Sequence, residues 1–353
     1  MNKGITYALL AAVLFGISTP FAKVLAGEYE PVLLAGLLYA GSGIGLSAWL
    51  VLRKAIAKPG NSVSRLGIPD FPWLAGAILS GGVLAPVLMM SGLSHASASS
   101  SSLLLNMEGV LTALLAWFVF REQFDRRIFL GMMLIIAGGV LLSWQSDPML
   151  GQVHESWGAL AVVAACLCWA IDNNLTRKVS TGDAVQIAAL KGLVSGAVNL
   201  SFALLWLGAP VPAWKSVASA GILGFGGYGL SLVLFVLALR HLGTARTGAY
   251  FSAAPFVGAA VSLLVLGEQP DRIFWFAAAL MGCGIWLHIT ESHDHLHRHD
   301  HMEHAHTHTH DAHHQHAHDF AWDGKEPHSH SHVHQPMEHA HPHFPDIHHR
   351  HTH

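Results

Sequence analysis

The sequence predicts an all-α membrane protein, in which ten transmembrane helices form two inverted five-helix repeats and a disordered His-rich tail follows them. Three observations predict this class. Hydrophobic residues make up 52% of the chain and charged residues only 12%. Apolar runs of about 20 residues recur, which is the length that crosses a hydrocarbon core of ~30 Å. The two halves of the apolar region resemble each other at a fixed offset, and histidines crowd the last part of the chain.

The ten apolar runs are joined by short connections, which leave no room for a sizeable inserted soluble domain. The first run contains Pro20 and Lys23 and has no clear cleavage signal, so we interpret it as a mature helix rather than a signal peptide. All three cysteines lie in apolar runs, which favours packing over disulfides or a metal site. The predicted helices span residues 5–25, 32–52, 73–93, 99–120, 128–145, 157–176, 184–207, 217–239, 246–266 and 273–290.

Lysine and arginine residues are distributed unevenly between the two sides of these helices. With a cytoplasmic N-terminus, the inner side carries Lys3 and the basic residues of segments 53–65, 121–127, 177–178 and 240–246. The outer side carries only Lys23, Lys215 and Arg272. The positive-inside rule therefore places the N-terminus in the cytoplasm, and ten spans return the chain to that side. We predict a multi-pass protein of the bacterial cytoplasmic (inner) membrane with both termini cytoplasmic.

An internal repeat divides the apolar region. At an offset of 146 residues, LSH at 93–95 aligns with LRH at 239–241, and EQFDR at 122–126 aligns with EQPDR at 268–272. Each repeat holds five helices, and because five is odd the second copy enters the membrane from the opposite side. Inverted repeats of this kind let a transporter present one site to both faces in turn. The predicted domains are a first repeat at 1–145, a second at 146–292 and a tail at 293–353.

Further motifs identify a family resemblance. The first helix reads Phe15-Gly16 followed by Lys23, and its counterpart reads Trp169-Ala170 followed by Arg177. The run LLNMEGVLTALLAWFVFREQF includes Glu122, and the run GAYFSAAPFVGAAVSLLVLGEQP carries Pro255 and Glu268. With these motifs, residues 5–290 resemble the drug/metabolite transporter superfamily with two EamA-type domains. The resemblance implies a transporter of small organic solutes and leaves the substrate open. The tail has no counterpart in the family pattern, and Gly109 stands where the second repeat has Pro255.

Ionisable residues inside the predicted helices are candidates for the transport path, since each costs ~2.5–3.5 kcal/mol at the centre of a membrane helix. Buried charges of opposite sign would relieve this cost by pairing. The alternatives are a purely structural ion pair, or snorkelling of Lys23 and Asp172 to the interface. The residues that we predict to line the path are Lys23, Asn106, Glu108, Asp172, Asn173, Asn174, Lys191, Tyr228 and Tyr250.

Glycine and proline residues at corresponding places in the two halves predict interrupted helices. Gly81-Gly82 in the third helix corresponds to a glycine-rich stretch at 224–229 in the eighth. We predict helix breaks at Gly109 and Pro255, where freed backbone carbonyls would line a cavity. The alternative is close packing of helices through small residues. The equivalent residues His95 and His241 are interpreted as helix caps, and Glu122 and Glu268 as anchors of the following turns, with Arg126 and Arg272 four residues on.

The tail predicts binding of a late first-row metal. Of the 28 histidines in the chain, all but His95, His154, His241 and His288 lie in residues 293–353. Neutral imidazole is a ligand for Zn, Ni, Co and Cu, and a flexible strand of imidazoles chelates such ions without a prebuilt site. The tail lacks the aliphatic residues for a core, so we expect it to be disordered. The predicted metal ligands are His293, His295, His297, His299, His301, His304, His306, His308 and His310.

Together these features predict a secondary-active exporter of a small polar metabolite or amino-acid-like solute, with a metal-binding tail and no required cofactor. One alternative is efflux of Ni, Co or Zn, with the tail as collector. The other is a non-transporting membrane metal sensor or buffer. The sequence shows no catalytic constellation or Walker-type phosphate loop, so we expect no enzyme. Because its basic residues outside the tail follow topology, we expect no nucleic-acid partner. The expected partners are the lipid bilayer and a small-molecule or metal-ion substrate, and a homodimer stays open.

Overall fold

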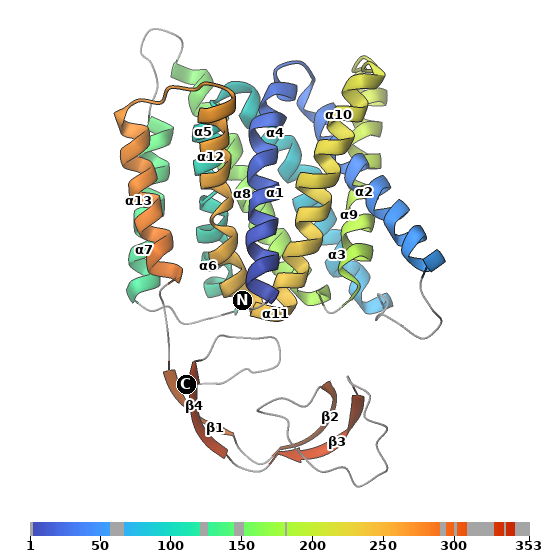
Figure 1. Ribbon diagram of the computed structural model, residues 1–353, viewed down its shortest axis with the longest axis vertical. Coiled ribbons are helices and arrows are strands. Elements are labelled where there is room, and N and C mark those ends of the chain that lie inside the picture. Colours follow the sequence, from blue (N-terminus) through green and yellow to red (C-terminus); the bar gives the residue numbers. More distant parts are fainter. Residues whose placement is uncertain are drawn as a thin grey trace. The chain divides into compact units, whose positions relative to one another are not determined.

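The structure is a computed structural model, which describes residues 3–56, 67–120, 126–144, 152–180, 182–289, 294–299, 302–308, 328–334 and 337–342. The helical part up to Glu291 and the tail segment Ser292–Phe344 are separate compact units. The helical unit is a bundle of long helices that lie side by side (Figure 1). This confirms the predicted all-α membrane fold.

In the first repeat, several helices change type or are interrupted along their length. The elements are α1 (Lys3–Ala26), α2 (Pro31–Ile56), the 3₁₀ turn η1 (Ile68–Asp70), α3 (Phe71–Ala77), the π-helical turn η2 (Ile78–Leu84), α4 (Ala85–His95), α5 (Ala98–Leu104), α6 (Met107–Phe120) and α7 (Arg126–Trp144).

The second repeat follows the same plan, again with a π-helical turn and a later interruption. Its elements are α8 (Gln152–Val179), α9 (Ala184–Ser201), the π-helical turn η3 (Phe202–Trp206), α10 (Trp214–Gly224), the π-helical turn η4 (Phe225–Leu230), α11 (Ser231–Phe251), α12 (Ala254–Val265) and α13 (Arg272–Ile289).

Seven spans among the described residues are long and apolar enough to cross a membrane. They are Lys3–Ala26, Pro31–Arg53, Ile68–His95, Trp157–Val179, Ala184–Trp206, Trp214–Leu242 and Thr247–Val265. Two shorter apolar helices, Phe129–Leu142 and Arg272–Leu287, occupy the places of the predicted fifth and tenth spans. The predicted fourth span is interrupted between α5 and α6. The count of ten spans therefore stays a prediction.

The helix pairs of the bundle show how the two repeats interlock. The second helices of the repeats pack together as α2 and α9, and the fifth helices pack together as α7 and α13 (Figure 1). The first helices are exchanged: α1 packs against α11 and α12 of the second repeat, whereas α8 packs against α4 and α6 of the first. Glycine allows the closest contact, since a Cβ atom at Gly43 of α2 would lie 2.3 Å from the backbone nitrogen of Leu193 of α9. The interface between the repeats is therefore the interior of the bundle.

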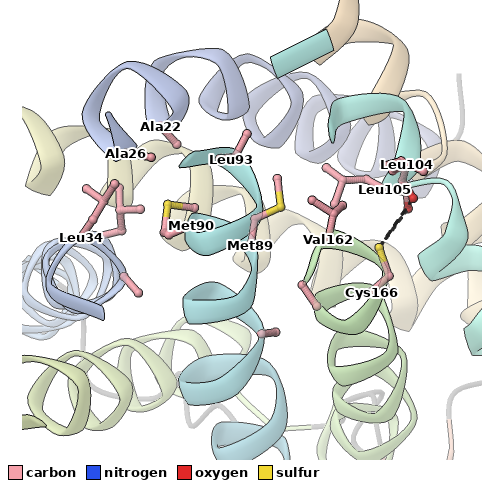
Figure 2. Packing of buried hydrophobic residues seen from close by; sticks show 14 of the residues in the cluster. Ala22, Ala26, Leu34, Met89, Met90, Leu93, Leu104, Leu105, Val162 and Cys166 are labelled. Atoms are coloured by element: carbon pink, nitrogen blue, oxygen red, sulfur yellow. Dashed lines mark hydrogen bonds between the residues drawn. The ribbon is translucent and has the colours of Figure 1, made fainter. Parts of the chain in front are cut away.

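A hydrophobic cluster surrounds α4 on one side of this interior. Met89, Met90 and Leu93 of α4 lie between apolar residues of α1, α2, α5 and α8 (Figure 2). Cys166 of α8 is fully buried in the cluster, and its thiol approaches the carbonyl oxygen of Leu104 at 3.7 Å. Cys166 is a free cysteine that packs like a small hydrophobic residue, as predicted.

The described parts of the tail are four short strands, where we predicted disorder. Strand β1 (Asp294–His299) pairs with β4 (Met337–Pro342), and β2 (Met302–His308) pairs with β3 (His328–His334), both antiparallel. The register sets histidines opposite each other, for example His306 with His330. The all-α description therefore applies to the helical unit.

Candidate functional site

A cavity of about 70 Å³ lies inside the helical unit, between the two repeats. The first repeat contributes one residue from each of α1, α2 and α6. The second repeat contributes the rest, mainly from α8, η4 and α11. The lining residues are Phe15, Tyr39, Glu108, Trp169, Asp172, Asn173, Lys191, Gly227, Tyr228, Ser231, Leu232, Phe235 and Phe251.

An ion pair forms the most deeply buried part of the wall. The Nζ atom of Lys191 in α9 lies 2.5 Å and 2.7 Å from the two carboxylate oxygens of Asp172 in α8. Thr176 lies one turn after Asp172, and its hydroxyl donates to the Asp172 carboxylate at 2.8 Å and accepts from Lys191 Nζ at 3.2 Å. Lys191 is 2% exposed and Asp172 6%. The two charges therefore compensate each other where water is excluded, which is the pairing we expected for buried charges in these helices.

A second carboxylate in the cavity wall has a different environment. Glu108, in the first turn of α6, accepts a hydrogen bond of 2.7 Å from the side-chain amide of Asn173. Among the described residues, no cationic group pairs with Glu108. An amide leaves the charge of a carboxylate unbalanced, whereas Lys191 balances that of Asp172. Glu108 is therefore the carboxylate of the cavity that is available to a ligand.

The π-helical turn η2 explains why Asp172 fits here. A π-turn spaces its hydrogen bonds more widely than an α-helix, which frees carbonyl groups for other donors. The carbonyl of Gly81 accepts hydrogen bonds from the Tyr39 hydroxyl at 2.8 Å and from Trp169 Nε1 at 3.1 Å. Glycine is required because a Cβ atom at Gly81 would lie 1.9 Å from Asp172 Oδ2. The turn thereby admits the carboxylate and fixes two aromatic rings of the wall.

The equivalent turn of the second repeat, η4, contacts α1, the first helix of the first repeat, whereas η2 contacts α8, the first helix of the second repeat. A Cβ atom at Gly227 would lie 2.3 Å from the Cβ atom of Ser18 in α1. The alignment that pairs Phe15 with Trp169 also pairs Ser18 with Asp172. Equivalent glycines thus lie against equivalent residues of the first helix of the opposite repeat. Gly227 lies against Ser18, and Gly81 lies against Asp172. The glycine-rich stretches predicted to break helices 3 and 8 are in fact π-helical turns.

Aromatic rings form most of the remaining wall, and Tyr228 is the one among them that was predicted to line the path. Phe15 and Trp169, the equivalent residues of the two repeats, meet edge to face with ring centroids 5.8 Å apart. Phe15 also contacts Tyr228 at 5.8 Å and Phe251 at 5.6 Å, and Phe251 contacts Phe235 at 4.9 Å. Phe15 and Trp169 were quoted only as family motifs, although their equivalence across an inverted repeat could have placed both near the centre.

Five predicted path residues line the cavity, and four do not. The five are Glu108, Asp172, Asn173, Lys191 and Tyr228.

The other four predicted path residues lie elsewhere in the helical unit. Lys23 donates to the carbonyl of Leu93 at 2.5 Å, near the ends of α1 and α4. Asn174 bonds its own helix, at the carbonyl of Ala170. Tyr250 packs in a separate apolar cluster with Ala8, Ala238 and Leu242, among others.

The fourth, Asn106, marks one of the two helix breaks, which differ from the prediction in position. The first repeat is interrupted at Leu105–Asn106 rather than at Gly109, which lies inside α6. The side chain of Asn106 bonds the carbonyl of Leu103, and that of Ser252 bonds the carbonyl of Gly248 at the equivalent break. Such side chains compete with the helix for its carbonyls. Pro255 lies in the first turn of α12, just after the second break.

Glu268 forms a cross-repeat contact, unlike the turn anchor that we predicted. Its two carboxylate oxygens accept hydrogen bonds from the backbone N–H groups of Ala98 and Ser99, each at 2.9 Å. These groups begin α5 of the first repeat, where an anion is favoured by the helix dipole. Its predicted counterpart, Glu122, lies outside the described residues, as do His293, His301 and His310.

Among the described residues, no group of three or more His, Cys, Asp and Glu side chains could hold a metal ion. His95 lies at the end of α4, where its Nδ1 atom is 2.9 Å from the carbonyl oxygen of Ser91. The ring of His241 contacts that of Tyr7. Metal binding by the tail stays a prediction.

Comparison with known proteins places this geometry in context. The profile described as the EamA-like transporter family matches residues 2–144 and 156–290, one copy in each half. An uncharacterized transporter of Methanothermobacter thermautotrophicus is 30% identical over 289 residues, which cover 79% of this chain and 84% of that protein. The probable 4-amino-4-deoxy-L-arabinose-phosphoundecaprenol flippase subunit ArnE of Pseudomonas aeruginosa is 37% identical over 111 residues, which cover 31% of this chain and 93% of that protein.

A solved structure shares the fold. One crystal structure superimposes with a TM-score of 0.60 at 21% identity and covers 82% of this chain and 98% of the matched chain. At this identity the likeness concerns the fold alone.

Proposed function

Because this chain belongs to the EamA-like transporter family, we propose that it is a secondary-active exporter of a small polar metabolite or amino-acid-like solute. The observation that supports this most strongly is the cavity between the two repeats, which holds Glu108 and the Asp172–Lys191 pair. Substrate sites of inverted-repeat transporters lie at the repeat interface near the membrane midplane. Ionisable groups at that depth are costly, so their presence favours a function in binding or coupling.

The two carboxylates suit different roles. Asp172 is held by Lys191 and Thr176, so we assign it to the architecture of the site. Glu108 has a neutral amide partner, so we assign it to binding and to exchange of a coupling proton. ArnE, similar to one part of this chain, is named for an amino sugar linked to a lipid phosphate. That name supports a polar solute rather than a metal ion for the cavity.

Transport by the purified full-length protein in proteoliposomes tests the proposal. We expect uptake of labelled small solutes that exceeds empty liposomes and that a pH gradient drives uphill. Glu108→Gln keeps the shape of the side chain and removes its charge, so it should abolish accumulation driven by the pH gradient. Glu28→Gln, an exposed glutamate between α1 and α2, is the matched control.

If Glu108→Gln accumulates solute as the wild type does, Glu108 is not the coupling residue. Failure of every solute class to cross would contradict the transporter itself.

The tail supports a second, separable proposal, that residues 293–353 bind divalent metal ions from their side of the membrane. Its repeated His-x-His pattern is the observation that favours this. Comparing the full chain with a variant lacking 293–353 separates the alternatives. If the tail buffers or senses metal, deletion lowers the number of Zn²⁺ or Ni²⁺ ions bound and leaves solute transport intact. Loss of all transport on deletion, together with Ni²⁺ or Zn²⁺ flux by the full chain, would favour metal efflux.

A further inference from the structure

The wall of the cavity has the chemistry of a cation site, and this inference rests on the proposal above that the cavity is the transport site. Six of its lining residues are aromatic: Phe15, Tyr39, Trp169, Tyr228, Phe235 and Phe251. The face of an aromatic ring carries negative electrostatic potential, which attracts ammonium groups that approach within ~6 Å of the ring centre. Rings gathered around one small space are the arrangement that binds organic ammonium ions in proteins.

The charges of the lining point the same way. Glu108 and Asp172 are its acidic residues and Lys191 is its basic residue. Since Lys191 contacts both oxygens of Asp172, that pair is neutral as a unit and offers no free cation to a ligand. Glu108 then leaves one carboxylate in excess, beside the rings. A ligand with one positive charge balances the site.

We propose that the substrate is a small organic ammonium cation, whose charged group binds between Glu108 and the aromatic rings. The size of the cavity agrees with this, because an engineered cavity of about 150 Å³ holds benzene, and this one measures about 70 Å³. In this conformation it holds an ammonium group with a few carbon atoms. An anion would meet Glu108, and the carboxylate of a zwitterion would have to break the Asp172–Lys191 pair to find a cation in the lining.

Matched probes test this in proteoliposomes that contain the full chain. Ethanolamine and 3-aminopropanol are cations with two and three carbon atoms, and glycine and β-alanine are their zwitterionic counterparts of similar size. We expect each labelled cation to exchange about tenfold faster than its counterpart, or more. The reason is that leaving a charge unbalanced in such a site costs more free energy than a tenfold difference in binding represents. Calorimetric titration of the same four probes into the purified protein gives an independent measure of binding.

Two pairs of variants assign the effect to the cavity. Glu108→Gln should weaken binding of ethanolamine by about tenfold, whereas Glu28→Gln should leave it unchanged. Tyr228→Leu removes a ring from the wall and Tyr228→Phe keeps it, so ethanolamine binding should fall further in Tyr228→Leu. Size-exclusion profiles establish that each variant is folded.

The outcomes separate this inference from the proposed function. Faster exchange of a zwitterion than of its cation, or equal exchange of both, overturns the inference and leaves the transporter standing. Calorimetric binding of either cation without exchange of any probe supports the inference and contradicts the transporter. If neither cation binds or exchanges, or if Glu108→Gln binds ethanolamine as the wild type does, the inference is overturned.

Discussion

Two equivalent π-helical turns, η2 in the first repeat and η4 in the second, have the same backbone conformation but different side-chain surroundings. Both admit a first-helix residue against a glycine, Asp172 against Gly81 and Ser18 against Gly227. Around η2 the side chains form an ion pair and two hydrogen bonds to the Gly81 carbonyl. At η4, Tyr228 presents an aromatic ring to the same cavity.

The difference shows what the duplication supplies and what it does not. The repeated glycines supply a symmetric scaffold with a place near the bundle centre for one residue from each first helix. An aspartate at one of these places, with Lys191 opposite it, adds a charged pair to the cavity wall, whereas at η4 Tyr228 adds an aromatic ring. Substitutions at η2 and equivalent substitutions at η4 should therefore lower the stability of the protein by different amounts.

The largest expected effect follows from breaking the ion pair. Asp172→Asn leaves Lys191 buried without a counter-charge, which costs about 3–5 kcal/mol. Ser18→Ala, at the equivalent place on η4, removes only a hydroxyl that bonds the carbonyl of Phe15, and should cost about 1 kcal/mol. Thermal unfolding of the purified protein in detergent measures both.

Asp172→Asn combined with Lys191→Met should recover most of the lost stability, because the second change removes the unpaired charge. If the double variant is no more stable than Asp172→Asn alone, the pair is not the source of the loss.

Adding a methyl group to either glycine should have the next largest effect. Gly81→Ala and Gly227→Ala each place an atom against the facing first helix, and overpacking of this kind costs about 1–3 kcal/mol. Ser18→Gly should rescue Gly227→Ala because it removes the atoms that the new methyl group meets. Asp172→Gly should not rescue Gly81→Ala, since it leaves Lys191 unpaired.

Denaturation of the wild type, the four single variants and the two double variants measures these couplings. Equal rescue at the two turns would contradict the proposed difference between them.

A smaller effect is expected from the hydrogen bonds to the Gly81 carbonyl. Tyr39→Phe removes one donor to this carbonyl and leaves Trp169 in place, so the loss should be about 1 kcal/mol. Tyr228→Phe is the control on η4, since the described residues show no hydrogen bond to the Tyr228 hydroxyl. The shift in melting temperature should be measurable for Tyr39→Phe and close to zero for Tyr228→Phe. A larger shift in melting temperature for Tyr228→Phe than for Tyr39→Phe would mean that the hydrogen bond to the Gly81 carbonyl does not stabilise η2.

The smallest effect on the helical unit is expected from the tail. Deleting residues 293–353 should leave the melting temperature and the transport rate unchanged and should alter only the response to added Zn²⁺. The tail segment Ser292–Phe344 is a compact unit separate from the helical unit, and the residues that line the cavity all belong to the helical unit. A fall in melting temperature on deletion, in the absence of metal, would contradict this independence.

The sequence predicted the features that depend on polarity and periodicity. The length of the apolar runs predicted the membrane helices, and the rarity of charge inside them singled out Glu108, Asp172 and Lys191, which line one cavity. The glycines at 81 and 227 were identified as special, but their geometry was not, because π-helical turns have no residue pattern that separates them from close packing of small residues.

The rest of the site depends on how helices from the two halves meet. Phe235 and Phe251 resemble any other aromatic residue in an apolar run, so only the three-dimensional packing shows that they face Phe15. Lys23 and Tyr250 satisfied the same polarity criteria as Asp172, yet neither lines the cavity. A break was expected at Gly109 on conformational grounds, whereas Asn106 interrupts the helix by bonding a backbone carbonyl.

Labelling from the two sides of the membrane tests the central claim, that the cavity between the repeats opens to each face in turn. The variant carries Leu232→Cys in the cavity wall, and alanine replaces its three native cysteines. A membrane-impermeant maleimide should label it in both right-side-out and inside-out vesicles, and a saturating transported solute should slow both reactions. Val194→Cys, on the exposed surface of α9, should stay unlabelled in lipid. Labelling of Leu232→Cys from one side only, or at a rate that no transported solute changes, would contradict the claim.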